Sequence, residues 1–362
     1  MITVHNFTKD WLLSVNNKLC WSRQEDQLKN LEKAIAALYL LELLADTNLK
    51  FIFKGGTSLF LLLKNIYRLS VDIDIIVDDP SADANRIFEQ VCSDSKLFTH
   101  FVYEERDRRT FLEVKHYKFF YQPFADSVEN SYIILDWYES ANPYSKILEL
   151  ELVSEILDTQ GENKFVRVPD IDSILGDKLT AFAPDTIGIS LSAEPGHRPK
   201  RIEVLKQLFD IGNLYNVAEN VENIRSSYTK IAKQEIKGHE LNITAEDTLR
   251  DSLRHAYIIG HKGKIDKLDY MSIAKGFNDF RKFVVDLRFD ENHAILAAAK
   301  TAYLVSVLLS GGNDIEKYDE RIDMEHWVIK DEAFRDFNDY KYSNPEAFFY
   351  WHKGIAMFNP NI

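Results

Sequence analysis

Two aspartates lie within an apolar stretch, Val71 to Val77, whose β-branched residues predict a buried strand. Asp72 and Asp74 are two residues apart, so in a strand both side chains project from the same face. Two buried carboxylates are costly as anions and repel each other, and a divalent cation removes this repulsion. Carboxylate oxygens suit Mg²⁺ or Mn²⁺, so the pair predicts a metal site. The alternative is an edge strand with one solvated acidic face.

A glycine-containing turn lies upstream, between a short β-type run, Phe51 to Phe53, and an apolar segment, Leu59 to Ile66, that has the length of a short helix. Adjacent glycines let the backbone approach a ligand, and Thr and Ser are good N-caps. The N-terminus of a helix binds anions, phosphate above all; a plain tight turn with a capped helix is the alternative. A phosphate seat beside a metal-binding pair is what a nucleoside triphosphate requires. The turn residues are Gly55, Gly56, Thr57 and Ser58.

The segment from Lys54 to Leu59, followed by the segment from Arg68 to Asp74, is similar to the AbiEii/AbiGii toxin family. More broadly, the order of turn, helix and paired aspartates resembles the nucleotidyltransferase superfamily that includes DNA polymerase β. The resemblance implies an α+β fold, in which a mixed sheet with flanking helices is followed by a helical C-terminal domain. It also implies that the two aspartates bind metal and that a later strand supplies a third carboxylate.

Asp136 is the candidate for this third carboxylate, because it stands in a second apolar strand, Ser131 to Tyr138. A third oxygen donor would complete the metal site and help to deprotonate the attacking hydroxyl. An ordinary aspartate at the end of a strand is the alternative, and Asp126 and Glu139 are the fallback candidates. Arg68, just before the aspartate pair, is expected to pair with the carboxylates or with phosphate, or to form an ordinary salt bridge.

Composition and charge narrow the class of protein. The 362 residues suit two domains or one large one, and 45% hydrophobic with 28% charged residues is ordinary for a soluble globular protein. Only Cys20 and Cys92 are present, so neither a disulfide framework nor a cysteine zinc site is expected, and a cytoplasmic location is favoured. No signal segment is evident, and the apolar runs near Ala34–Ala45 and Ala294–Leu309 predict no membrane span. The net charge of −13 argues against broad, nonspecific binding of nucleic acid.

Helical patterns replace strands after Pro169, which predicts a domain boundary near residue 165. With the resemblance, residues 1–165 are expected to form the nucleotidyltransferase domain, and residues 166–362 a helical domain that completes the active cleft. The histidines His239, His255 and His261 lack metal-ligand spacing and are expected in the core or on the surface. The expected helices are Asp170–Ala183, Ile202–Val217, Val221–Glu235, Thr244–Ile259, Leu268–Leu287, Glu291–Leu309 and Pro345–Met357.

Three residues of the helical part gain a role from the resemblance. Lys178 stands in a K-L-x-A segment and is expected to reach the nucleotide; a Lys that lies along the apolar surface is the alternative. Lys206 and Asp210 are four residues apart on one helix face, in a segment similar to the family's K-Q-L-x-D. The resemblance implies that Asp210 positions Lys178 and that Lys206 lies near phosphates, whereas a surface ion pair is the alternative.

These patterns together predict a metal-dependent nucleotidyltransferase that moves a nucleoside monophosphate from an NTP to an acceptor and releases pyrophosphate. Mg²⁺ or Mn²⁺ is the expected cofactor. From the resemblance, the acceptor is RNA, most plausibly a tRNA end, the protein is the toxin of a toxin–antitoxin or abortive-infection system, and a cognate antitoxin is a partner. The alternatives are an antibiotic-modifying nucleotidyltransferase, a D-x-D glycosyltransferase and a non-catalytic interaction protein.

Overall fold

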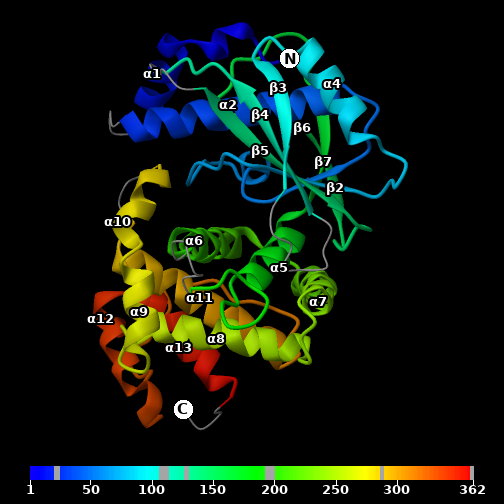
Figure 1. The fold of residues 1–362 in the computed structure, drawn as a ribbon. Coiled ribbons are helices and arrows are strands. Elements are labelled where there is room, and N and C mark those ends of the chain that lie inside the picture. The colour runs from blue at the N-terminus through cyan, green and yellow to red at the C-terminus, as the bar shows by residue number, and fades with distance from the viewer. Residues whose placement is uncertain (20–24, 106–113, 126–129, 192–199, 286–288, 359–362) are drawn as a thin grey trace. The chain divides into compact units, whose positions relative to one another are not determined.

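The computed structural model describes residues 1–19, 25–105, 114–125, 130–191, 200–285 and 289–358 (Figure 1). The chain forms two compact units. The first unit comprises Met1–Asp170 together with Lys282–Leu287, and the second comprises Ile171–Arg281 and Arg288–Ile362. The first unit is therefore discontinuous in sequence, because a short segment returns to it after most of the helices of the second unit.

A mixed five-stranded sheet with the strand order β1-β2-β5-β4-β3 organises the described part of the first unit. β2 and β5 are parallel, and the other neighbouring strands are antiparallel. The strands are β1 (Ile52–Lys54), β2 (Ile73–Val77), β3 (Phe98–Glu104), β4 (Val114–Tyr121) and β5 (Ser131–Glu139). The predicted strands that carry the candidate carboxylates are confirmed, although β2 begins after Asp72.

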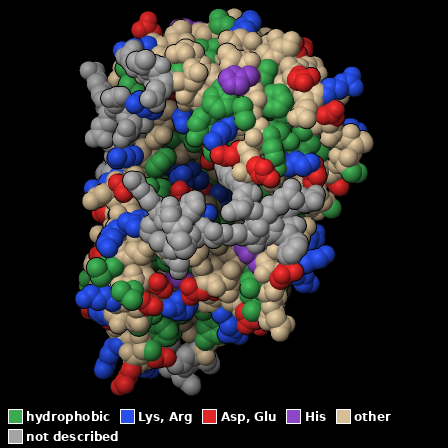
Figure 2. All heavy atoms as spheres, viewed as in Figure 1, with side chains coloured by type: hydrophobic (Ala, Val, Ile, Leu, Met, Phe, Trp, Pro, Cys, Tyr) green, Lys and Arg blue, Asp and Glu red, His purple; other side chains and the backbone are tan. Residues whose placement is uncertain are grey.

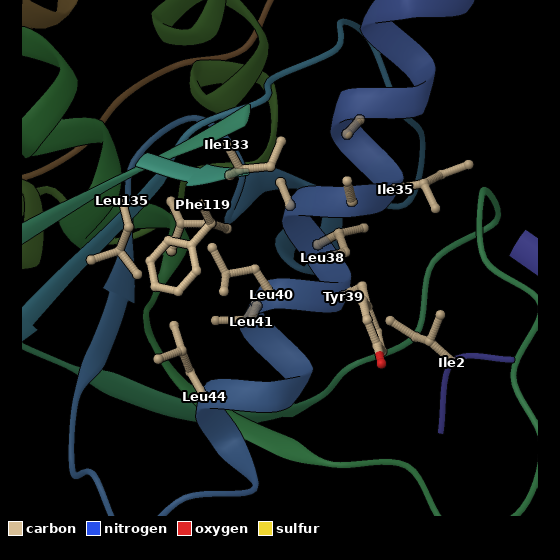
Figure 3. Packing of buried hydrophobic residues seen from close by; sticks show 14 of the residues in the cluster. Ile2, Ile35, Leu38, Tyr39, Leu40, Leu41, Leu44, Phe119, Ile133 and Leu135 are labelled. Atoms are coloured by element: carbon tan, nitrogen blue, oxygen red, sulfur yellow. The ribbon is translucent and has the colours of Figure 1, made fainter. Parts of the chain in front are cut away.

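One face of this sheet carries the core of the first unit. Ile133, Leu135 and Trp137 alternate along β5 and are fully buried, as the period of two residues in a strand requires. The Phe88 ring of α4 contacts the ring of Trp137 edge-on, at 5.6 Å between centroids. Figure 3 shows α2 against the same face, with Leu38, Leu40, Leu41 and Leu44 near Phe119, Ile133 and Leu135. The half-exposed residues of β5, including Asp136, therefore lie on the opposite face.

The remaining elements of the first unit surround this sheet. β6 (Ile147–Glu151) and β7 (Phe165–Pro169) form a separate antiparallel pair. The helices are η1 (Val4–Phe7), α1 (Lys9–Lys18), α2 (Glu25–Ala45), α3 (Leu59–Leu62) and α4 (Ala84–Asp94).

The described part of the second unit is helical. Its helices are α5 (Ile171–Ala181), α6 (Arg201–Val217), α7 (Val221–Gly238), α8 (Ala245–Gly260), α9 (Lys267–Ala274), α10 (Phe277–Phe280), α11 (Glu291–Leu309), η3 (Glu332–Asp339), α12 (Tyr340–Ser343) and α13 (Pro345–Ala356). The short helix η2 (Arg281–Phe283) lies where the chain passes back to the first unit. The predicted α+β fold class, with a helical C-terminal part, is confirmed.

One predicted helix is wrong. Instead of one helix over residues 268–287, the chain forms α9, α10 and η2 in succession. Gly276 separates α9 from α10, and an added Cβ there would lie 2.8 Å from a methyl carbon of Leu205. Beyond the break, Val284 forms an antiparallel bridge with Arg68. Apolar spacing along this segment cannot distinguish burial in a helix from burial in a strand-like pairing with a distant part of the chain.

α11 is the described helix that is long and apolar enough to cross a membrane, yet 78% of its apolar window is buried inside the structure. Lys300 lies in its middle, where its Nζ is 2.7 Å from a carboxylate oxygen of Glu346. α11 therefore packs as a core helix of the second unit. On the face shown in Figure 2, acidic and basic side chains of the described residues are interspersed.

Candidate functional site

Two candidate carboxylates lie on neighbouring strands of the main sheet. In the parallel pairing of β2 with β5, Asp74 is the direct partner of Asp136. Neighbouring strands are about 4.8 Å apart, so the pairing brings two aspartates that are distant in sequence side by side. On the other side of β2, Lys54 at the end of β1 is the partner of Asp74. The sheet thus places the residue that leads into the glycine turn and two acids on three adjacent strands.

Gly55 makes room for the Asp74 side chain. Its φ is +79°, in the left-handed region that favours glycine. A Cβ added at this position would lie 2.1 Å from Asp74 Oδ2 and 2.8 Å from its carboxyl carbon. The Asp74 carboxylate therefore rests directly against the turn, and glycine is required at position 55 for both its backbone conformation and this contact.

Gly56 makes room for a different pair of side chains. An added Cβ would lie 2.5 Å from a guanidinium nitrogen of Arg68 and 2.8 Å from Ser70 Oγ. Arg68 is buried, and its other terminal nitrogen donates to the Leu69 carbonyl oxygen at 3.0 Å. The sequence predicts that the glycine pair lets a ligand approach the backbone. In the structure, the Asp74 carboxylate lies against Gly55 and the Arg68 guanidinium lies against Gly56.

Thr57 and Ser58 do not cap a helix as the sequence predicted. The Ser58 side chain makes no capping hydrogen bond, and its hydroxyl instead donates to the Gly55 carbonyl oxygen at 2.7 Å. The Thr57 hydroxyl donates to the Asp72 carbonyl oxygen at 2.5 Å. The helix that follows, α3, has four residues, so it lacks the aligned peptides that make a helix N-terminus an anion site. Both hydroxyls instead hold the turn in shape and tie it to the segment that carries the aspartates.

His116 is a site residue that the sequence reasoning missed. It pairs with Asp136 across β4 and β5, and its Nδ1 lies 2.7 Å from Asp136 Oδ1. Both side chains are about one-fifth exposed. A second neighbour, Tyr138, lies two residues further along β5, with Lys54 Nζ 4.7 Å from the centre of its ring. Only the strand register reveals these contacts, because His116 and Asp136 carry no common sequence motif.

The fallback candidates for the third carboxylate have different surroundings. Glu139, at the end of β5, forms an ion pair with Lys115. Asp126 lies outside the described residues.

The predicted residues of the second unit form a buried cluster of their own. Lys178 on α5 lies 2.9 Å from Asp210 Oδ2 on α6, and the two side chains are 8% and 1% exposed. Lys178 also donates to Gln207 Oε1 at 3.1 Å. The expected contact between Asp210 and Lys178 is therefore present, and a Lys that merely lies along apolar surface is excluded. Lys206, one turn before Asp210, is half-buried.

The acids of the first unit suit a divalent cation. Asp74 and Asp136 supply carboxylate oxygens, the donors that Mg²⁺ and Mn²⁺ prefer, and the half-buried Asp72 directly precedes β2. Ligating carboxylates are themselves commonly hydrogen-bonded, as Asp136 is by His116. In the second unit, donor atoms of Asp185, Asp251 and His255 also lie within 4.8 Å of one another.

A mixed sheet with acids paired across two parallel strands, next to a Gly-Gly turn, is typical of nucleotidyltransferases. Residues 39–290, more than half of the chain, match the family model described as "Nucleotidyl transferase AbiEii toxin, Type IV TA system". The chain therefore belongs to the AbiEii nucleotidyltransferase toxin family, as its motifs indicated. A comparison with curated proteins gave no match. Membership establishes the general class, a nucleotidyl transferase of a toxin–antitoxin system, and implies a cognate antitoxin.

Proposed function

We propose that the protein transfers a nucleoside monophosphate from an NTP to the end of an RNA, most plausibly a tRNA, and releases pyrophosphate in the cytoplasm. The observation that carries this proposal is the pairing of Asp74 with Asp136, next to a turn in which Gly55 is shaped around the Asp74 carboxylate. Family membership supports the general transfer chemistry. The acceptor, the metal dependence and the release of pyrophosphate are the parts that we add.

Asp72, Asp74 and Asp136 would hold Mg²⁺ or Mn²⁺, which would supply charge neutralisation for the triphosphate and lower the pKa of the attacking hydroxyl. The acceptor oxygen forms a bond to the α-phosphorus, the bond from that phosphorus to the β-phosphate oxygen breaks, and Asp136 accepts the hydroxyl proton. His116 keeps the Asp136 carboxylate oriented for this role through the hydrogen bond at 2.7 Å. The chain's contribution is mostly positioning and electrostatics, as in phosphoryl transfer generally.

The phosphates are assigned to the turn from Gly55 to Ser58, which the two hydroxyl contacts hold in a fixed shape. Arg68 adds a buried positive charge against this turn. In the second unit, the roles of Lys178, Lys206 and Asp210 follow from the family resemblance: Lys178 offsets phosphate charge, Asp210 orients it, and Lys206 supplements it. The ion pair between Lys178 and Asp210 supports the orienting role.

The test is incubation of the purified protein with each labelled NTP, total RNA and Mg²⁺, followed by separation of RNA from small molecules. We expect label in a narrow RNA size class, no label when EDTA is present, and no label with Asp74→Ala. Asp78→Asn is the matched control, because it removes a carboxylate from an exposed position just beyond β2 and should leave transfer unchanged.

Other results of these assays would support one of the alternative functions. Label that enters aminoglycoside-type hydroxyl compounds but not RNA would indicate an antibiotic-modifying enzyme. Turnover of UDP-sugars would indicate a glycosyltransferase. Full transfer by Asp74→Ala would refute the assignment of the acidic pair, and absence of heat on titration with Mg–NTP would identify a non-catalytic member of the family.

A further inference from the structure

A buried histidine in the second unit faces several carboxylates. His255 on α8 is fully buried, and Asp251 lies one helical turn before it. Asp185 comes from the turn after α5, and Asp269 comes from α9. Three separate segments therefore bring acids to one imidazole, and none of these residues belongs to the candidate transferase site.

The two ring nitrogens of His255 have different surroundings. Nδ1 is 3.1 Å from the Asp251 carbonyl oxygen, which can only accept, so this nitrogen carries a hydrogen and donates it there. Asp251 Oδ1 lies 2.8 Å from Nδ1 but accepts no hydrogen bond within the described part of the chain. Among the described residues, the buried Nε2 has no hydrogen-bond partner. In a neutral ring with hydrogen on Nδ1, Nε2 presents a lone pair. An unmatched buried lone pair is costly, which indicates a missing electrophilic partner.

The position of that partner is marked by two carboxylates. Nε2 lies 3.9 Å from Asp185 Oδ1 and 3.8 Å from Asp269 Oδ2, too far for hydrogen bonds. Two donors bound to one Zn²⁺ at about 2.1 Å each can lie up to about 4.2 Å apart. The observed separations therefore exceed hydrogen-bonding distance and remain within the span that one cation bridges.

We propose that the Asp185–Asp251–His255 cluster binds a transition-metal dication of the Zn²⁺ class. His255 Nε2 and Asp185 Oδ1 are ligands, and Asp269 is within reach as a third. Asp251 orients the ring by accepting the Nδ1 hydrogen at its backbone carbonyl oxygen, one of the usual partners of a metal-binding histidine. A nitrogen donor favours Zn²⁺ over Mg²⁺, which prefers oxygen donors and retains water.

The charges around the ring favour a cation. Arg254 binds Asp185 Oδ2 at 2.6 Å and Asp266 Oδ2 at 2.8 Å, and it is 3.5 Å from Asp269 Oδ2. One guanidinium cannot neutralise these three acids together with Asp251. The Asp185 side chain is 54% exposed, so this proposed ligand is in contact with solvent. A bound ion would link the turn after α5 to α8 and so stabilise the second unit.

A proton is the competitor for the same nitrogen. A protonated ring that needs no metal is the rival interpretation, and it predicts no uptake of metal.

The test uses full-length protein with Asp72→Ala and Asp74→Ala, so that the acids of the first unit cannot contribute. We expect one equivalent of Co²⁺ to produce visible ligand-field bands, Zn²⁺ to displace it, and millimolar Mg²⁺ to leave the bands unchanged. Adding Asp185→Asn should weaken Co²⁺ binding at least about tenfold, the usual effect of losing a ligand or its support. The half-exposed position of Asp185 makes this variant compatible with folding.

Asp266→Asn is the matched control. It removes the same charge from the same Arg254 network, an asparagine can still accept the hydrogen bond from Asp269 N, and no contact links Asp266 to His255 among the described residues. We expect this variant to bind Co²⁺ like its parent. Absence of Co²⁺ bands in the parent, or equal weakening by Asp266→Asn, would overturn the site. Neither result bears on nucleotide transfer, which is measured separately with the unaltered protein.

Discussion

Replacing Gly55 by alanine should disturb the transferase site through the Asp74 side chain. Alanine at φ +79° costs about 1–2 kcal/mol, the penalty of a left-handed conformation. Its Cβ would also lie 2.1 Å from Asp74 Oδ2, so the carboxylate must leave its position, at about 0.5–1.5 kcal/mol if it turns away from a favoured rotamer. The free energy of unfolding should fall by about 1.5–3.5 kcal/mol in total.

A double-mutant cycle separates these two contributions. In an Asp74→Ala background the clash with the carboxylate is absent and only the Cβ contact at 3.2 Å remains, so the cost of Gly55→Ala should fall close to the backbone penalty of about 1–2 kcal/mol. Gly161→Ala provides the control, because Gly161 has a φ of +74° and nothing within 4 Å of an added Cβ. Urea unfolding of the variants gives the free energies, provided that the m-value stays constant.

Activity provides the second measurement. Displacement of the Asp74 carboxylate by about 1 Å should lower transfer about 100-fold in Gly55→Ala, whereas Gly161→Ala should retain full activity. An equal cost of Gly55→Ala with and without Asp74 would refute the contact between the two positions. Transfer at the normal rate by the Gly55→Ala protein would refute the dependence of activity on the position of the Asp74 carboxylate.

The remaining predictions concern buried charge and the pH dependence of a thiol. Asp210→Asn should lower the free energy of unfolding by about 3–5 kcal/mol, because it leaves the buried Lys178 cation without its anionic partner. The double change Lys178→Met with Asp210→Leu removes both charges and should cost much less. Urea midpoints that rank these variants the other way would contradict this prediction. Burial raises the pKa of the Cys92 thiol to about 11. Only about one thousandth of the Cys92 side chains are thiolate at pH 8. In a Cys20→Ser background, alkylation of Cys92 should therefore be hundreds of times slower than that of a free thiol, and it should accelerate as the pH rises towards 11. Labelling of Cys92 at the rate of a free thiol would refute this prediction.

The local pattern of the sequence predicts β2 and β5 well, because buried strands need apolar residues and both segments supply them. The pattern also draws attention to Asp74 and Asp136, since charged residues in such strands require an explanation. It cannot show that the two acids are direct partners, because the register between parallel strands depends on the whole sheet. The same limit hides His116, whose importance comes only from the residue opposite it.

Structural predictions from the sequence are wrong where the local preference of a residue competes with contacts to distant parts of the chain. Ser58 is a good N-cap by type, but its hydroxyl is used within the glycine turn. The segment around Val284 has helical spacing, yet it pairs with Arg68. In the second unit, the four-residue spacing of Asp251 and His255 is visible in the sequence, whereas the approach of Asp185 to the ring appears only in three dimensions.

The return of the chain to the first unit has a consequence for synthesis on the ribosome. The Leu69 N–H donates to the Phe283 carbonyl oxygen, and the Val285 N–H donates to the Tyr67 carbonyl oxygen. The backbone at residues 67–69 therefore lacks these hydrogen-bond partners until residue 285 has been made. At elongation rates of about 5–20 residues per second, residue 285 follows residue 170 by roughly 6–23 seconds. A nascent chain that stops near residue 170 would lack these two backbone hydrogen bonds, so the segment that leads into Asp72 and Asp74 is completed only late in translation.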